Sequence, residues 1–265
     1  MNTKISKTAI GFIFGFIFAL SGTVQAQEKL ILLGGGGYTP EAIAKFVHWA
    51  GGKDAKILVL PWATSTPQEE FDDVKEMFSK YSVAQINRGL SPDDKAYLKT
   101  DLLFQIDHAT GIFFPGGDQV DLMDRINRDP EIRPSLLRAY HQGIVFGGYS
   151  AGTAMASKTM ITGRGDFTVI NPQQVETAAG LGLVSKFVID QHFLARQRQN
   201  RLLSVLQTSQ ENLGIGIDEG MALVLEDEAR GTIMGDSFVT VFRRKNSSQN
   251  FEMNLLKRGD TILIP

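Results

Sequence analysis

The sequence contains no cysteine and no excess of positive charge. A chain without thiols forms no disulfides, thiolate zinc sites or iron–sulfur clusters, and it has no cysteine nucleophile. The formal net charge of -2 provides no basic field for phosphates, so we expect no nucleic-acid partner. The 265 residues are 43% hydrophobic and 21% charged, which is typical of a globular protein and not of a disordered or multi-pass membrane chain.

The start of the chain has the pattern of an export signal. Lys4 and Lys7 form a cationic start, an apolar run covers residues 8–20, and Ala26 ends a short stretch of the kind that precedes a cleavage site. The apolar run is shorter than the roughly 20 residues of a membrane span, which favours cleavage over an uncleaved anchor. We therefore expect a signal peptide over residues 1–26 and a periplasmic or secreted protein. Residues 27–265 are expected to form a single domain without a membrane span.

Short apolar runs alternate with segments of helical periodicity along the first half of the mature chain. Because these runs are uniformly hydrophobic, they are typical of buried parallel strands. We predict an α/β fold of three layers with a doubly wound, mostly parallel, flavodoxin-like sheet. Later and shorter runs indicate antiparallel pairs at an edge of this sheet. The parallel strands are expected near residues 30–33, 57–60, 83–86, 111–114 and 143–146.

Helices are expected between these strands. One begins at Pro40, and another follows Thr66, whose spacing to Glu69 fits a capping box. A third is expected to begin near Ser91, and two more begin near Gln119 and Ile132.

The sequence Gly148-Tyr149-Ser150-Ala151-Gly152 stands between a predicted strand and a helix of small residues. A sharp strand-to-helix turn of this kind requires small neighbours and exposes the central side chain at the carboxyl edge of the sheet. We therefore predict a nucleophile elbow with Ser150 as the nucleophile. The alternative is an ordinary glycine-rich turn.

Pro115-Gly116-Gly117-Asp118-Gln119 follows another predicted strand. The backbone N–H groups of Gly117 and Ala151 would together form an oxyanion hole. A compatible interpretation is a tight turn in which Asp118 caps the next helix. Gln119 is then either a helix-start residue or a substrate ligand.

Of the four histidines, only His192 is placed at a predicted strand end among polar neighbours, where a general base would lie. A third group should orient its imidazole, and Glu219 is favoured over Asp166. The alternative for Glu219 is an ion pair with the arginines at 196, 198 and 201. Those arginines are either a solvated helix face or a cluster that recognises carboxylates.

The glycine run Gly34–Gly37 does not match a dinucleotide-binding fingerprint, because Thr39 stands where the third glycine belongs. No histidine or carboxylate spacing suggests a metal site either. We therefore expect no cofactor.

Taken together and in this order, the motifs resemble cyanophycinase and its relatives among the serine peptidases, which are related to aspartyl dipeptidase and share the class I glutamine-amidotransferase-like fold. The resemblance extends from about Leu30 to Leu225. It implies a catalytic triad of Ser150, His192 and Glu219. It further implies a pocket lined by Gln119, Asp190, Gln191, Arg196, Arg198 and Arg201.

The resemblance also implies the activity. The expected reaction is the hydrolysis of β-aspartyl linkages in cyanophycin, a multi-arginyl-poly-aspartate, with release of β-Asp-Arg dipeptides. An aspartyl or isoaspartyl dipeptidase acting on short acidic peptides would use the same residues, and a non-catalytic binding protein of this fold is the third alternative. The expected partner is a peptide or polymer with β-linked aspartate, and a homodimer is compatible with the sequence. Tyr149 departs from the family pattern, which has a smaller residue before the nucleophile.

Overall fold

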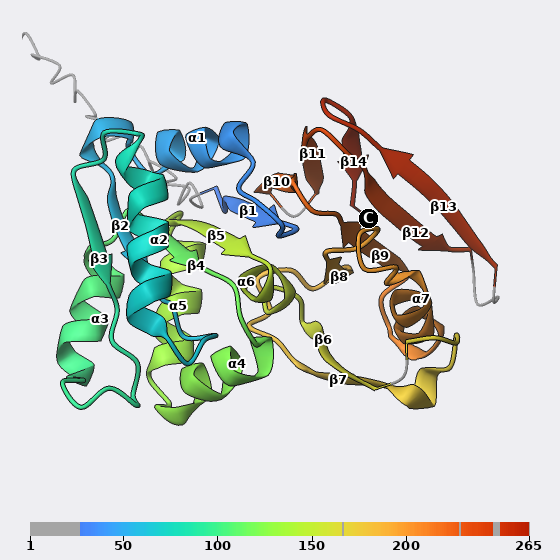
Figure 1. Ribbon diagram of the computed structural model, residues 1–265, viewed down its shortest axis with the longest axis horizontal. Helices are drawn as coiled ribbons and strands as arrows, with labels where there is room; N and C mark the ends of the chain where they lie inside the picture. Colours follow the sequence, from blue (N-terminus) through green and yellow to red (C-terminus); the bar gives the residue numbers. More distant parts are fainter. Residues whose placement is uncertain (1–26, 166, 228, 246–249, 265) are drawn as a thin grey trace, which may run out of the picture.

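The computed structural model describes residues 27–264 except 166, 228 and 246–249. The expected signal peptide and Asp166 therefore lie outside the described residues. An eight-stranded sheet runs through the molecule in the order β14-β11-β10-β1-β5-β4-β2-β3 (Figure 1). Five of its strands are mutually parallel: β1 (Leu30–Leu33), β5 (Val145–Tyr149), β4 (Gly111–Phe114), β2 (Lys56–Val59) and β3 (Gln85–Arg88). Antiparallel strands extend one edge: β10 (Met221–Asp227), β11 (Arg230–Gly235) and β14 (Thr261–Leu263).

Helices cover both faces of this sheet because its central strands are apolar on both faces. In β1, Ile31 packs toward one hydrophobic cluster and Leu32 toward the other. The first cluster is completed by α1 (Pro40–Trp49) and α2 (Pro67–Ser79). The second includes side chains of α3 (Lys99–His108), α4 (Gln119–Arg128), α5 (Ile132–His141) and α6 (Ala151–Ala154). The predicted three-layer, mostly parallel α/β fold is confirmed.

A second, four-stranded sheet lies at the opposite end of the molecule from α2 and α3 (Figure 1). Its strands, in spatial order, are β13 (Phe251–Leu256), β12 (Val239–Arg244), β9 (Leu213–Ile217) and β8 (Val188–Gln191), and α7 (Gln199–Thr208) packs on one face. The predicted antiparallel pairing of the late strands is confirmed for β10 with β11 and for β9 with β12. The predicted position at an edge of the large sheet is wrong for β9 and β12, which lie in the second sheet. A two-stranded ribbon, β6 (Thr159–Gly165) and β7 (Val175–Ala179), and two short 3-10 turns, Gly52–Asp54 and Pro172–Gln174, complete the described elements.

Two expected helix starts differ from the structure. The helix predicted near Ser91 begins only at Lys99, because the Asp94 carboxylate accepts hydrogen bonds from the Ser91 backbone N–H at 2.7 Å and from its hydroxyl at 3.0 Å, which holds a turn. The α2 helix begins where expected, but Thr66 makes no capping hydrogen bond; its hydroxyl lies 3.4 Å from that of Thr64. None of the helices in the described part of the chain combines the length and the apolar character that crossing a membrane requires.

The turn from β5 into α6 depends on close backbone packing. A Cβ atom added to Gly152 would lie 2.0 Å from the carbonyl oxygen of Phe114 at the end of β4. Backbone cannot move aside as a flexible side chain can, so α6 reaches its place only with glycine at this position.

Gly152→Ala is therefore expected to lower the free energy of unfolding by about 1–3 kcal/mol through overpacking. Urea denaturation followed by circular dichroism should show a lower midpoint with an unchanged slope. An unchanged midpoint would show that the turn accommodates a methyl group.

Candidate active site

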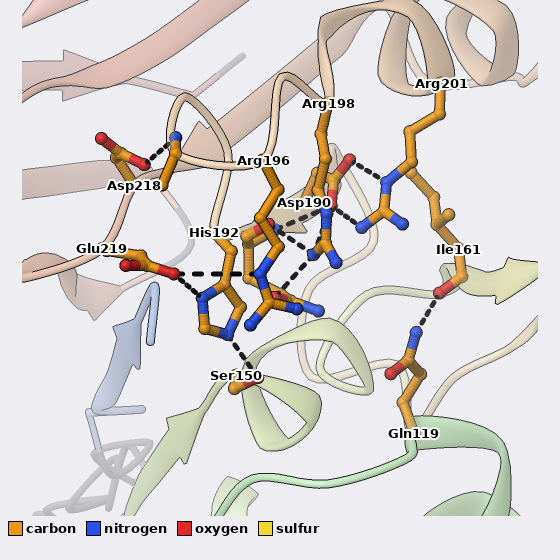
Figure 2. A network of polar contacts seen from close by, with 12 residues as sticks. Gln119, Ser150, Ile161, Asp190, His192, Arg196, Arg198, Arg201, Asp218 and Glu219 are labelled. Carbon is orange, nitrogen blue, oxygen red and sulfur yellow. Dashed lines mark hydrogen bonds and ion pairs between the residues drawn. The ribbon is translucent and has the colours of Figure 1, made fainter. Parts of the chain in front are cut away.

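Three polar side chains meet where strands of the two sheets end (Figure 2). Ser150 follows β5, His192 follows β8, and Glu219 comes two residues after β9. The Ser150 Oγ lies 2.9 Å from His192 Nε2, and His192 Nδ1 lies 2.5 Å from Glu219 Oε1. The structure thus joins the predicted serine, histidine and glutamate in one hydrogen-bonded chain.

The backbone is strained at two of these three residues. Ser150 has a φ of 52° and His192 a φ of 46°, in the left-handed region that non-glycine residues rarely occupy. Such a conformation persists only where surrounding contacts impose it, and it is found preferentially at functional sites. The positive φ of Ser150 is the strained turn conformation expected at a nucleophile elbow.

The glycine run after β1 supports all three side chains. The Ser150 N–H donates to the Leu33 carbonyl at 3.1 Å, and the His192 N–H donates to the Gly34 carbonyl at 2.8 Å. A Cβ at Gly35 would lie 2.2 Å from the His192 ring, and one at Gly36 would lie 2.5 Å from the Glu219 carboxylate. The role of this run in supporting the three side chains could not be predicted from its sequence, which was interpreted only as a pattern that does not match a nucleotide-binding motif. The only available signal was four glycines directly after a buried strand.

The imidazole of His192 is almost fully enclosed, with a side-chain exposure of 8%. Burial lowers the pKa of His192 below the usual 6.5, the hydrogen bond that its Nδ1–H donates to Glu219 partly opposes this, and the nearby Arg196 lowers the pKa further. The neutral ring therefore predominates near pH 7, and a neutral imidazole can accept the proton of Ser150. Arg196 Nε also lies 3.8 Å from Glu219 Oε1, so the Glu219 carboxylate contacts both the His192 imidazole and Arg196.

Of the two expected oxyanion donors, one is adjacent to Ser150 in the chain and the other belongs to a turn that packs beside it. Ala151 follows it directly, and a Cβ on Gly116, the neighbour of Gly117, would lie 3.6 Å from Ser150 Cβ. Asp118 caps α4, because its carboxylate accepts from the Val120 N–H at 2.7 Å. The helix-cap interpretation of Asp118 is therefore confirmed, and it holds the Gly116–Gly117 turn next to the serine.

The expected pocket residues divide into buried and accessible ones. Asp190 and Arg201 have side-chain exposures of 1% and 2% and form a two-contact ion pair, with Arg201 Nε 2.7 Å from Asp190 Oδ2. Arg198 donates to both the backbone and the side-chain oxygen of Gln191, at 2.7 and 2.8 Å. Burial, together with Arg201, lowers the pKa of Arg198 to about 10. The Arg196 side chain is 54% exposed.

The buried and the accessible residues of the expected pocket lie at different places relative to Ser150. Asp190 lies between the guanidinium groups of Arg201, with which it is paired, and Arg198, 3.9 Å away, whereas Arg196 and Arg198 present cations near Ser150 (Figure 2). Gln119 is buried, and its amide donates to the Ile161 carbonyl at 2.8 Å. Within the described ranges, no three histidine, aspartate or glutamate side chains are grouped as a metal ion would require.

Comparisons with known proteins agree with this geometry. Residues 30–233 match peptidase family S51, which covers more than half of the chain. The cyanophycinase of Geminocystis herdmanii is 31% identical over 223 residues, which are 81% of this chain and 80% of that protein. Peptidase E of Streptomyces coelicolor is 31% identical over 153 residues, which are 54% of this chain and 60% of that protein.

A solved structure shares the fold. The crystal structure of a peptidase from an acI-B1 actinobacterium superposes with a TM-score of 0.70 at 19% identity, covering 91% of this chain and 98% of that one. This chain belongs to peptidase family S51 and is a serine-type peptidase.

The buried Asp190–Arg201 pair makes a stability prediction. Arg201→Met removes both close contacts of the buried Asp190 carboxylate and leaves only Arg198, 3.9 Å away, so it should lower the free energy of unfolding by about 3 kcal/mol. The double variant Asp190→Asn/Arg201→Met should recover most of this loss, because no buried charge remains. Arg164→Met, at a pair that is 60% and 53% exposed, is the control and should cost less than about 1 kcal/mol. Equal losses in the single and double variants would contradict this account.

The burial of His192 predicts its titration. Its imidazole should titrate below 6.5 in nuclear magnetic resonance spectra, and lower still in Glu219→Gln, because the amide removes the opposing negative charge. Since the folded-state pKa lies below the unfolded value, protonation of His192 favours unfolding, and this effect appears only as the pH falls below about 6.5. A pKa at or above 6.5, or one that rises in Glu219→Gln, would overturn the assignment of causes.

Proposed function

We propose that this protein is a hydrolase of cyanophycin that releases β-Asp-Arg dipeptides through a Ser150–His192–Glu219 triad. The observation that carries the proposal is the continuous hydrogen-bonded chain of these three side chains, in a member of family S51 that is about 30% identical to cyanophycinases. The nearby cations of Arg196 and Arg198 support an acidic substrate.

Each residue of the triad has one task in the proposed reaction. Ser150 Oγ attacks an amide carbonyl while His192 Nε2 takes its proton and later passes it to the leaving amine. Glu219 holds the imidazole through Nδ1 and stabilises its positive charge. The N–H groups of Gly117 and Ala151 bind the oxyanion, and water then hydrolyses the acyl-enzyme.

The product defines which bond is cut. A β-Asp-Arg dipeptide still contains its β-linkage, so the scissile amide is the one that joins successive aspartates of the polymer backbone. This replaces the expectation that the β-aspartyl linkage itself is hydrolysed. Each unit of such a polymer carries a free carboxylate on its arginine branch, and Arg196 or Arg198 would pair with it.

The remaining expectations from the sequence complete the proposal. Residues 1–26 would direct export, and residues 27–265 would act as one domain in the periplasm or outside the cell, with the homodimer as the assembly to test. The similarity to a peptidase E favours a second candidate, an aspartyl or isoaspartyl dipeptidase.

The two candidates differ in substrate length. The purified protein would be incubated with cyanophycin, with β-Asp dipeptides and with α-Asp dipeptides, and the products identified by mass spectrometry. Release of β-Asp-Arg from the polymer supports the first candidate. Turnover of dipeptides alone supports the second and rejects the first.

Ser150→Ala should abolish hydrolysis while preserving the fold. Removal of a triad serine lowers kcat by about 10⁶-fold in a serine peptidase. Circular dichroism and the thermal midpoint should match the wild type, because the small Ala side chain fits the elbow. Retained cleavage by a folded Ser150→Ala variant would reject Ser150 as the nucleophile.

A further inference from the structure

Two tyrosine rings line the side of Ser150 toward α1 and α2. Tyr149 precedes the nucleophile, and its ring centroid lies 4.5 Å from that of Tyr38. A Cβ on Gly116 would lie 3.4 Å from the Tyr149 ring and 3.6 Å from Ser150 Cβ. Tyr149 therefore fills the space between Gly116 and Tyr38, directly beside the serine.

A carboxylate accompanies the two rings. Glu70, in the first turn of α2, is half-buried, and the backbone N–H of Gly116 donates to it. Burial raises the pKa of Tyr38 and of Tyr149, and the charge of Glu70 raises both further; burial also raises the pKa of Glu70 itself. No Lys or Arg of the described chain forms an ion pair with Glu70. Glu70 is thus a partly desolvated carboxyl group without a Lys or Arg ion-pair partner among the described residues, and it lies next to Gly116.

Two cavities border Tyr38. Tyr38 borders a cavity of about 350 Å³ that reaches Glu219, and a second of about 420 Å³ that runs along α2 past Asp73. Of Glu70 and the two tyrosines, only Tyr38 borders these two cavities, and one of them also borders Glu219.

Cationic side chains lie on another segment near Ser150. Arg196 and Arg198 extend from the segment between β8 and α7 (Figure 2). Besides burial, the charges of Glu70, Glu219 and Arg196 all act on Tyr149. Tyr149 therefore has both anionic and cationic side chains around it. A substrate branch that carries both a carboxylate and a cation would match this polarity.

We propose that Glu70, with the rings of Tyr38 and Tyr149, binds the guanidinium group of the arginine branch beside the scissile bond and so makes the enzyme selective for arginine-bearing substrates. The inference rests on the proposed function. A guanidinium forms charge-assisted hydrogen bonds with a carboxylate and stacks on phenol rings, so the three side chains match its chemistry. Glu70 is a specificity residue in this proposal and has no part in bond cleavage.

The test uses two synthetic trimers of the repeating unit, one of β-Asp-Arg and one in which citrulline replaces arginine. Citrulline keeps the shape of the branch and removes its charge. The variant Glu70→Gln also keeps an oxygen for the Gly116 N–H and removes only the charge. Glu69→Gln, at an exposed neighbour on the same helix, is the matched control.

The wild type and Glu69→Gln should prefer the arginine trimer. In Glu70→Gln, KM for this trimer should rise about tenfold with little change in kcat, in line with the loss of a hydrogen bond to a charged group, and the citrulline trimer should be unaffected. Glu70→Asp should restore part of the preference, because the charge returns on a shorter side chain.

Two results would overturn the inference. An unchanged preference in Glu70→Gln would show that this carboxylate does not bind the branch. A fall in kcat for both trimers, together with slower labelling of Ser150 by an uncharged phosphonate, would show that Glu70 acts only by holding the Gly116–Gly117 turn. If the wild type cleaves neither trimer nor cyanophycin, the proposed function fails instead, so the two failures are distinguishable.

Discussion

The main chain at the end of β1 hydrogen-bonds to both parts of the candidate active site. Leu33, the last residue of β1, accepts from the N–H of Ser150, which follows a strand of the large sheet, and Gly34 accepts from the N–H of His192, which follows a strand of the small sheet. The next two residues lie so close to His192 and Glu219 that neither could carry a Cβ. Ser150 and His192 both have strained backbones, and their 2.9 Å contact is kept because this segment constrains both sides.

The charged side chains around the proposed nucleophile differ in how far they are exposed to solvent. The Asp190–Arg201 pair is closed off from solvent and lies next to Arg198, while Arg196 stays exposed beside Glu219. Glu70 lies beside two phenol rings. A buried ion pair contributes little to binding directly, but it holds neighbouring groups in place. Arg196 and Arg198 therefore lie near the serine together with their acidic neighbours, whereas Glu70 has no ion-pair partner among the described residues.

Much of this arrangement could be predicted from sequence patterns that reflect local interactions. The apolar runs located β1 and β4, and glycines between a strand and a helix located Ser150. His192 stood out because few histidines compete with it. Long-range contacts could not be predicted from the sequence. The glycine run contacts His192 and Glu219, which are more than 150 residues away, and β9 pairs with β12 in a separate sheet. The turn at Ser91 was missed because the Asp94 side chain satisfies the backbone there.

The central claim is that Ser150 is a nucleophile activated by His192. It is tested most directly by labelling the protein with a serine-directed phosphonate, followed by intact-mass measurement and peptide mapping. The account predicts one adduct per chain, located on Ser150, and a much slower reaction in His192→Ala. The absence of an adduct, or an adduct on a different serine, would contradict it.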